Sequence, residues 1–162
     1  MKLPAPIVGF LRERLLTIPD RRPPDVLIGG AEEPYLRRWW VIPRNPVFNV
    51  YLHHFMRSDD DRALHSHPWV SLSILLSGAY TEHTILAGGT NVRTVRRAGD
   101  LKARLPSSFH RIELHSGPCW TLFLTGPRVK DWYFACRDKL VHWRDFTSPD
   151  DKGKIGRGCG EN

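Results

Sequence analysis

Short apolar runs separated by turn residues are the feature that most limits how this chain can fold. From residue 35 onward they follow one another as YLRRWWVI, FNVYLHHFM, WVSLSILLSGAYTEHTIL, VRTVRRAG, LKARL, HRIEL, CWTLFLTG and VKDWYFAC. They show almost no helical periodicity, and AGGTN at 87–91 is typical of a hairpin turn. Seven or eight short strands of this kind predict an all-β sandwich or small barrel.

The two ends of the chain differ from this β-rich region. Residues 7–16 have an amphipathic pattern that predicts a short helix covering an end of the main body, and the Pro- and Gly-rich segment after it predicts an extended arm. The tail lacks the apolar residues that offset ordering entropy, which predicts a mobile extension or a strap across the barrel. We therefore divide the 162 residues into a helix and arm (1–34), a barrel (35–146) and a tail (147–162).

Composition narrows the cellular setting and the partners. No run of residues approaches the length of a membrane span, and no signal-like apolar core develops at the start, so we expect a soluble, cytoplasmic protein without a membrane partner. The net charge of +7 raises nucleic acid as a partner. The basic residues are scattered, often beside acids, and form no basic helix or aromatic–basic motif, so nucleic acid is not expected to bind.

The three cysteines, Cys119, Cys136 and Cys159, are far apart and form no CxxC pair. This spacing predicts neither a zinc knuckle nor a disulfide framework and suits a reducing compartment. Cys119 and Cys136 lie in apolar, strand-like contexts, which predicts buried structural thiols.

A His-x-His pair, His65 and His67, precedes the longest apolar run. Side chains two apart on a strand point to one face, so the pair has suitable spacing for two ligands of one metal ion. Solvent-exposed or hydrogen-bonded histidines are the alternative interpretation of this pair alone. If the strand continues to Leu75, the face that carries the two histidines also carries Ser71 and Ser73. The residues of the other face between 70 and 76 are all apolar. The pattern predicts a strand that lines a polar cavity on one side and packs on the other.

A second block, RRAGDLKARLPSSFHRIELH, supplies a third histidine. In it, Gly99 and Asp100 predict a turn, Pro106 a bend, and His110 the start of another strand. A histidine on a distant strand completes a three-imidazole site for a divalent transition metal.

The two blocks resemble the two motifs of the cupin superfamily over about residues 45–135. His65, His67 and the closing Gly78 match the first motif, and Gly99, Pro106 and His110 resemble the second. The chain is also similar to small bacterial and phage cupins that share the patterns DRALHSHPW, GAYTEH and GRGCGE. The resemblance implies a double-stranded β-helix, or jelly-roll barrel, with a metal bound by the three histidines.

The chain departs from the cupin pattern in three places. The first motif lacks its upstream Gly, the spacing after Pro106 is shifted, and Ser71 stands where the pattern has its metal-binding Glu. Cupins of the cysteine dioxygenase type hold Fe(II) with three histidines and no carboxylate. The resemblance therefore implies three ligands here and leaves the fourth unassigned.

Three neighbouring residues after the apolar run are candidates for catalysis. Tyr80 and Glu82 share a strand face, which presents a phenol and a carboxylate to one space, and His83 points to the other side. We take all three as candidate acid–base or second-layer residues beside the metal, with ordinary cross-strand pairing as the alternative.

Other histidines and acids have structural interpretations. His53 and His54 are expected to point to opposite faces of a strand, with at most one facing into the barrel. The charged run at 57–62 lacks the Gly and distal Glu of a calcium loop and predicts a solvated turn.

These observations lead to one preferred function and two alternatives. The preferred function is an Fe(II)-dependent dioxygenase acting on a small anionic substrate, with Zn, Mn or Ni as alternative metals. The alternatives are a binding module with a structural metal or none, and a metal-dependent cupin isomerase. The wholly apolar face of 70–76 also predicts a homodimer formed by sheet packing.

Overall fold

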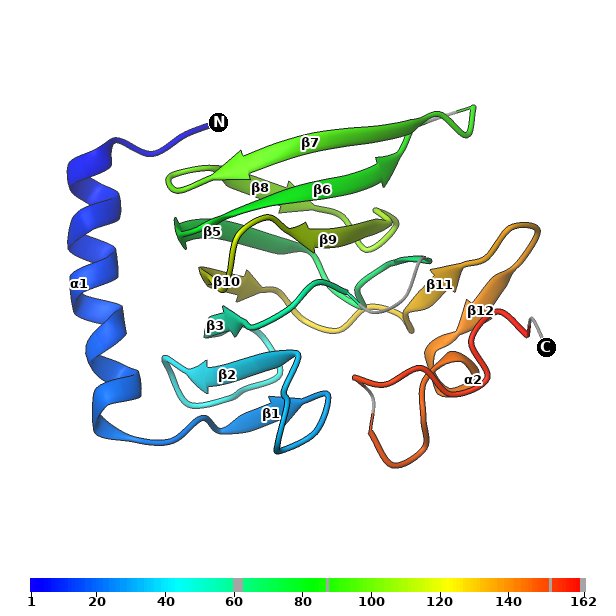
Figure 1. The fold of residues 1–162 in the computed structure, drawn as a ribbon, viewed down its shortest axis with the longest axis horizontal. Coiled ribbons are helices and arrows are strands. Elements are labelled where there is room, and N and C mark those ends of the chain that lie inside the picture. The colour runs from blue at the N-terminus through cyan, green and yellow to red at the C-terminus, as the bar shows by residue number, and fades with distance from the viewer. Residues whose placement is uncertain (60–62, 87, 152, 161–162) are drawn as a thin grey trace.

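Two antiparallel sheets and one long helix make up most of the structure, a computed structural model that describes residues 1–59, 63–86, 88–151 and 153–160 (Figure 1). The two sheets have six strands each and form the walls of the barrel. Among the described residues, no helix combines the length and apolar character that crossing a membrane requires.

The first sheet has the strand order β1-β2-β3-β10-β5-β8. Its strands are β1 (Val26–Ile28), β2 (Leu36–Trp40), β3 (Asn49–Phe55), β10 (Cys119–Thr125), β5 (Ser71–Ser77) and β8 (Leu101–Arg104). Strand β1 lies in the segment for which the sequence predicts an extended arm, so the arm adds a short edge strand to the sheet.

The second sheet has the order β12-β11-β4-β9-β6-β7. Its strands are β12 (Leu140–His142), β11 (Tyr133–Ala135), β4 (Leu64–His65), β9 (His110–Leu114), β6 (Ala79–Ile85) and β7 (Asn91–Arg97). Strands β6 and β7 form the hairpin predicted around 87–91, of which Ala87 lies outside the described residues.

Helix α1 (Ala5–Arg21) covers the outer face of the first sheet. Its apolar side, including Leu11 and Leu15, packs on a cluster that contains Ile74 and Leu76 of β5. The outer face that motivated the homodimer is therefore covered in large part by the chain's own helix. The homodimer stays a prediction.

A second apolar cluster fills the space between the sheets. It contains Phe55, Leu75, Tyr80, Ile112 and the fully buried Cys119. Burial raises the pKa of the Cys119 thiol, as expected of a structural cysteine.

The junction between β5 and β6 requires glycine. Gly78 has a φ of +89°, and a Cβ atom there would lie 2.5 Å from the Cys119 Sγ atom. The closing Gly of the first motif therefore has a steric reason in this chain.

The tail is a strap across one end of the barrel. After the short helix α2 (Trp143–Phe146), Thr147 pairs with Ile155, and Asp151 accepts a hydrogen bond from the Gly29 N–H of the arm. A Cβ atom on Gly153 would lie 2.3 Å from the Gly29 nitrogen, so tail and arm are in close contact.

A disulfide between Cys136 and Cys159 fastens this strap to the strand β11 region. The prediction of no disulfide, and of a buried thiol at Cys136, is wrong. The two cysteines are 23 positions apart in the sequence, and the chain between them folds back through β12 and α2, a return path that leaves no signal in the cysteine spacing.

The His-x-His pair does not lie on one continuous strand with Ser71. Strand β4 ends at His65, an irregular segment containing Pro68 follows, and β5 begins at Ser71. Proline lacks the N–H that a sheet ladder needs, which is consistent with the break.

Candidate metal centre

The three predicted histidines meet in the interior of the barrel. His65 of β4 is directly opposite His110 of β9 in the sheet register, and His67 follows in the irregular segment. Each of the three offers a ligand atom within 4.8 Å of the other two. The Nε2 atoms of His67 and His110 are 2.8 Å apart, so these two rings point at each other.

This donor set fits a divalent transition metal. Two nitrogens about 2.1 Å from one ion at right angles lie about 3.0 Å apart, close to the separation of His67 and His110. The Nδ1 atom of His65 is buried and has no hydrogen-bond partner among the described residues, whereas the Nδ1 atom of His110 faces away from His67, toward Glu82. Imidazole nitrogens without partners at a convergent site are what a bound cation satisfies.

Electrostatics keeps the three rings in the form that binds metal. Burial lowers the pKa of His65, and it lowers the pKa values of His67 and His110 well below the ordinary 6.5. The positive charge of Arg104 acts in the same direction on all three rings. All three are thus neutral at pH 7, as ligation requires.

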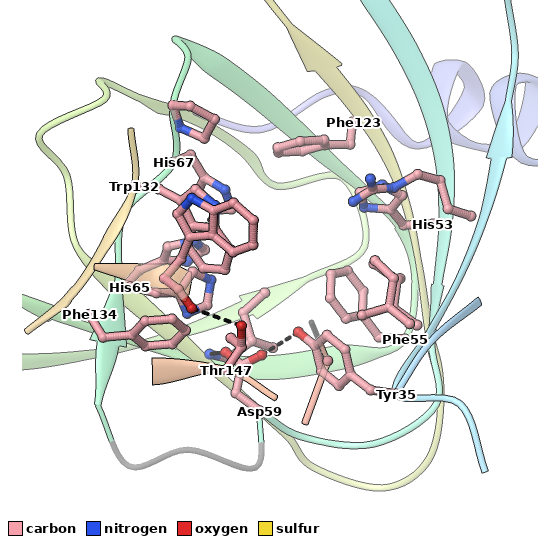
Figure 2. Close-up of a pocket in the computed structure, with 18 of the residues that line it drawn as sticks. Tyr35, His53, Phe55, Asp59, His65, His67, Phe123, Trp132, Phe134 and Thr147 are labelled. Atoms are coloured by element: carbon pink, nitrogen blue, oxygen red, sulfur yellow. Dashed lines mark hydrogen bonds between the residues drawn. The ribbon is translucent and has the colours of Figure 1, made fainter. Parts of the chain in front are cut away.

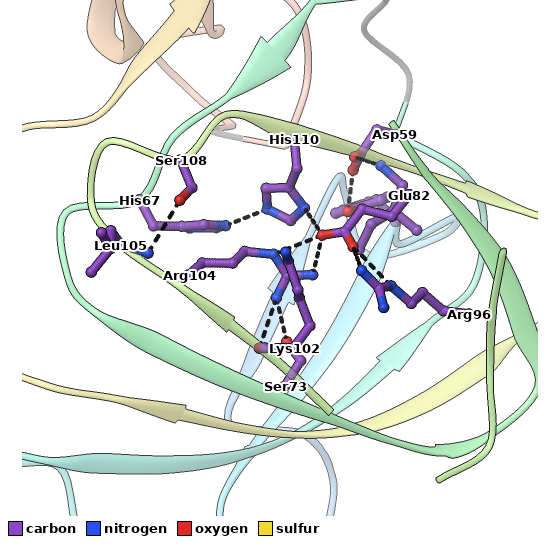
Figure 3. Close-up of polar contacts among 12 residues, drawn as sticks. Asp59, His67, Ser73, Glu82, Arg96, Lys102, Arg104, Leu105, Ser108 and His110 are labelled. Atoms are coloured by element: carbon purple, nitrogen blue, oxygen red, sulfur yellow. Dashed lines mark hydrogen bonds and ion pairs between the residues drawn. The ribbon is translucent and has the colours of Figure 1, made fainter. Parts of the chain in front are cut away.

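A buried ion network lies beside His110 (Figure 3). Glu82, which has no exposed surface, places its Oε1 atom 3.6 Å from the His110 Nδ1 atom. The same oxygen accepts hydrogen bonds from the Nε and Nη2 atoms of Arg104 at 2.9 and 2.5 Å, and Arg96 binds the other oxygen. Arg104 also donates to the Ser73 hydroxyl within the first sheet, and its bonds to Glu82 of β6 join that sheet to the second.

Ser71 does not replace the expected carboxylate. It is buried at the start of β5, its hydroxyl has no partner among the described residues, and it does not line the cavity at the histidines. No carboxylate oxygen joins the three-histidine group in the described part of the chain.

A cavity of about 440 Å³ opens beside the histidines, within the size range of small-molecule sites (Figure 2). One wall carries His65, His67, Trp132 and Phe134, and the opposite wall carries His53 with Phe55 and Phe123. The tail contributes Thr147, Gly153, Lys154 and Ile155 to the lining.

Solved structures with similar folds include two metalloproteins. Fe(II)-HppE in complex with a substrate matches with a TM-score of 0.51 and 13% identity, over 66% of this chain and 57% of that one. Oxalate decarboxylase from Bacillus subtilis, studied for its Mn(II) centres, matches with a TM-score of 0.51 and 14% identity, over 68% and 30%. This chain thus spans little more than half of HppE and less than a third of the decarboxylase.

A third structure is an uncharacterized conserved protein with a double-stranded β-helix domain from Klebsiella pneumoniae subsp. pneumoniae. It gives a TM-score of 0.49 and 18% identity, over 68% of this chain and 92% of that one. No family model and no curated sequence matches the chain.

The fold is a double-stranded β-helix, as the resemblance to the cupins implies. The two six-stranded sheets, the three histidines and the two matches at a TM-score of 0.51 agree on this. At these identities the matches establish the fold alone, so the chemistry must be argued from the residues of this chain.

The barrel brings two of the three candidate catalytic residues to the side of the three histidines. Tyr80 lines the cavity and is buried, which raises the pKa of its phenol. Glu82 lies behind His110 in the ion network. His83 is on the opposite face of β6, as its parity predicts, where its Nε2 atom is 2.7 Å from a Glu113 carboxylate oxygen.

His53 and His54 also divide as expected. His53 faces the cavity, and its Nε2 atom accepts a hydrogen bond from Arg38 at 2.8 Å. His54 stacks on Trp120 outside the barrel at a centroid distance of 3.8 Å, and burial lowers its pKa to about 4. Neither of them joins the three-histidine group.

Sequence reasoning missed three charged residues of the interior. Asp59 belongs to the run predicted as a solvated turn but is buried, bonded to the Tyr35 hydroxyl and the Ile112 N–H. Asp60, Asp61 and Arg62 of the same run lie outside the described residues. In the sequence, Arg38 and Arg104 look like the other scattered basic residues. They can be recognised as interior residues only when it is known which face of their strands points into the barrel.

Proposed function

We propose that this protein is an Fe(II)-dependent dioxygenase that holds its metal through His65, His67 and His110 and acts on a small organic anion. The observation that carries the proposal is the convergence of three neutral imidazoles at the wall of a substrate-sized cavity. The occurrence of Fe(II) and Mn(II) in the two cupin-fold neighbours supports the metal class.

Bound iron would supply the redox chemistry that lets O₂ react with an organic molecule. Three neutral ligands contribute no negative charge, so the full 2+ charge of the ion remains to attract an anionic substrate. The chain reinforces this attraction because both oxygens of Glu82 are neutralised by Arg96 and Arg104. Substrate binding next to the histidines is therefore selective for anions.

The surrounding residues have separate parts in this proposal. Tyr80 lines the cavity, and burial raises the pKa of its phenol, so it is protonated at neutral pH. Glu82 is a positioning residue that orients His110 through the buried network. Trp132 and Phe134 exclude water from the His65 side of the cavity. His83 is not assigned a role as acid or base, because it pairs with Glu113 and is not among the described residues that line the cavity.

Oxygen consumption tests the reaction. Purified protein reconstituted anaerobically with Fe(II) is mixed with a panel of small anionic thiols and diketones, and O₂ uptake is recorded with mass analysis of the product. We expect uptake with at least one class and both atoms of ¹⁸O₂ in the product. His110→Ala should abolish it, whereas His115→Ala, on an exposed loop histidine, should not.

Two other outcomes correspond to the alternative functions. Tight binding of Zn, Mn or Ni with turnover but no O₂ uptake would indicate a metal-dependent isomerase. A site that holds metal but turns over none of the panel, or holds no metal while binding the anions, would indicate a binding module. The missing carboxylate ligand at Ser71 is the observation that favours that module.

A further inference from the structure

The cavity carries more positive than negative charge. Its lining includes the basic residues Arg38, Arg44, Arg128 and Lys154, and Asp59 is its single acidic residue among those described. Both Asp59 oxygens are already engaged, by the Tyr35 hydroxyl and by the Ile112 N–H. Arg128 is paired with Asp131 at the surface. Arg44 and Lys154 are exposed, whereas Arg38 is half-buried, so Arg38 is the lining cation that lies deepest in the cavity among the described residues.

Arg38 is held in a fixed orientation. It is directly opposite His53 in the pairing of β2 with β3, and its Nε atom donates to the His53 Nε2 atom. Its guanidinium carbon lies 5.0 Å from the centre of the Tyr51 ring. These contacts occupy one edge and one face of the group.

The other edge of the Arg38 guanidinium has no carboxylate partner among the residues that the structure describes. A guanidinium has five N–H donors, and one is used by His53. Burial lowers the Arg38 pKa to about 10, so the group is still charged at neutral pH. A partly buried, oriented guanidinium with a free fork is suited to a planar carboxylate.

Arg38 faces the histidine cluster across an aromatic space. The Phe123 ring contacts both walls, because it lies 5.0 Å from the His53 ring and 5.9 Å from the His67 ring (Figure 2). Phe55 and Trp132 line the space as well. One small molecule can therefore contact Arg38 at one end and the histidines at the other, with an apolar body between them.

We propose that Arg38, oriented by His53, binds the carboxylate of an apolar organic acid whose opposite end reaches the three histidines. The assignment of that far end rests on the proposed function, whereas the Arg38 contact does not. The pair thereby selects the substrate class: acids with an aromatic or aliphatic body that fits about 440 Å³.

Binding measured on metal-free protein tests the Arg38 contact by itself. The probes are 3-phenylpropionate, hexanoate and the neutral 3-phenylpropanamide, titrated by calorimetry in the presence of EDTA. We expect both acids to bind and the amide to bind at least about ten-fold more weakly, because the amide has no charge for the guanidinium to pair with.

Three variants identify the residue responsible. Arg38→Met keeps an apolar stem and should weaken binding of 3-phenylpropionate to the level of the amide. Arg38→Lys keeps the charge but loses the planar fork and should give an intermediate loss, which preserves the test if the Met variant does not fold. Arg12→Met makes the same charge change on the exposed side of α1 and should leave binding unchanged.

Equal binding of acid and amide, unchanged binding in both folded Arg38 variants, or no binding of either acid at millimolar concentration would overturn the proposal. Failure of the proposed function is distinguishable from this. Carboxylate binding that depends on Arg38 in a protein that retains no metal would remove the dioxygenase and leave the carboxylate site. If metal content is normal and the Arg38 variants bind the acids as the wild type does, the carboxylate site would be removed and the proposed dioxygenase would remain.

Discussion

The Glu82 carboxylate lies directly behind His110, one of the three candidate metal ligands, and is neutralised by two arginines. Its Oε1 atom is 3.6 Å from the His110 Nδ1 atom and accepts from Arg104, and Arg96 binds its other oxygen. A carboxylate behind a ligating imidazole fixes the ring and makes it a stronger base. The two arginines prevent this carboxylate from acting as a ligand itself.

Glu82→Gln is expected to weaken both the metal site and the fold. Losing the group behind His110 should lower metal affinity by about 10- to 100-fold. Leaving Arg104 buried without its partner should lower the free energy of unfolding by about 3–5 kcal/mol. Metal titration and urea denaturation measure the two effects. Glu113→Gln, at a half-exposed carboxylate paired with His83, is the matched control and should change neither.

The disulfide between Cys136 and Cys159 predicts how many cysteines react with an alkylating reagent. Alkylation of the unreduced protein in guanidinium chloride should label one cysteine, Cys119, and alkylation after reduction should label three. In the folded protein Cys119 should react slowly, because it is fully buried. Labelling of three cysteines without reductant would show that the strap is not cross-linked.

Removing the cross-link should loosen the strap. Cys159→Ser is expected to lower the free energy of unfolding by about 3 kcal/mol, the loop-closure contribution for a loop of this size. Limited proteolysis should then cleave the tail near Lys154, which lines the cavity. A variant with wild-type stability and protease resistance would indicate that packing of Phe146 on Phe134, and not the disulfide, holds the tail.

The histidine pKa values predict acid tolerance of the metal site. Because burial lowers the pKa values of His65, His67 and His110 below 6.5, their ligating form persists to lower pH than that of ordinary histidines. Metal content after dialysis should therefore be the same at pH 7.5 and pH 6.0. Loss of half the metal near pH 6.5 would contradict the lowered values.

The same shifts predict how stability depends on pH without metal. Histidines of the unfolded chain take up protons near their ordinary pKa of 6.5, whereas the buried ones do so only at lower pH. The free energy of unfolding should therefore be greatest above pH 6.5 and fall as the pH is lowered toward the folded-state values. Urea denaturation in EDTA at pH 7.5 and 5.5 measures this, and an equal free energy at both values would contradict it.

Much of the barrel and its histidines followed from local patterns. The strand at Asn49–Phe55, the hairpin of β6 and β7, and the strand beginning at His110 coincide with predicted runs because alternation and turn residues are local signals. The cupin resemblance then placed two separated histidine motifs in one site. The three histidines do converge, even though β4 ends at His65 and the argument from a continuous strand does not apply; their role as metal ligands stays a prediction.

What the sequence did not predict depends on contacts between distant segments. Asp59 and Arg38 become interior residues only when the pairing of their segments with Ile112 and His53 is known. The same holds for Cys136 and Cys159, whose meeting depends on the path of the tail. The arm edge strand was missed because three residues are too few for a periodic signal.

Metal content is the most direct test of the central claim that His65, His67 and His110 form one metal centre. Untagged protein should contain close to one equivalent of a divalent transition metal by elemental analysis, and each single His→Ala variant at the three positions should contain far less. His115→Ala should keep the wild-type content. A wild-type protein without metal that also binds none when Fe(II), Mn(II) or Zn(II) is added, or variants that keep their metal, would contradict the account.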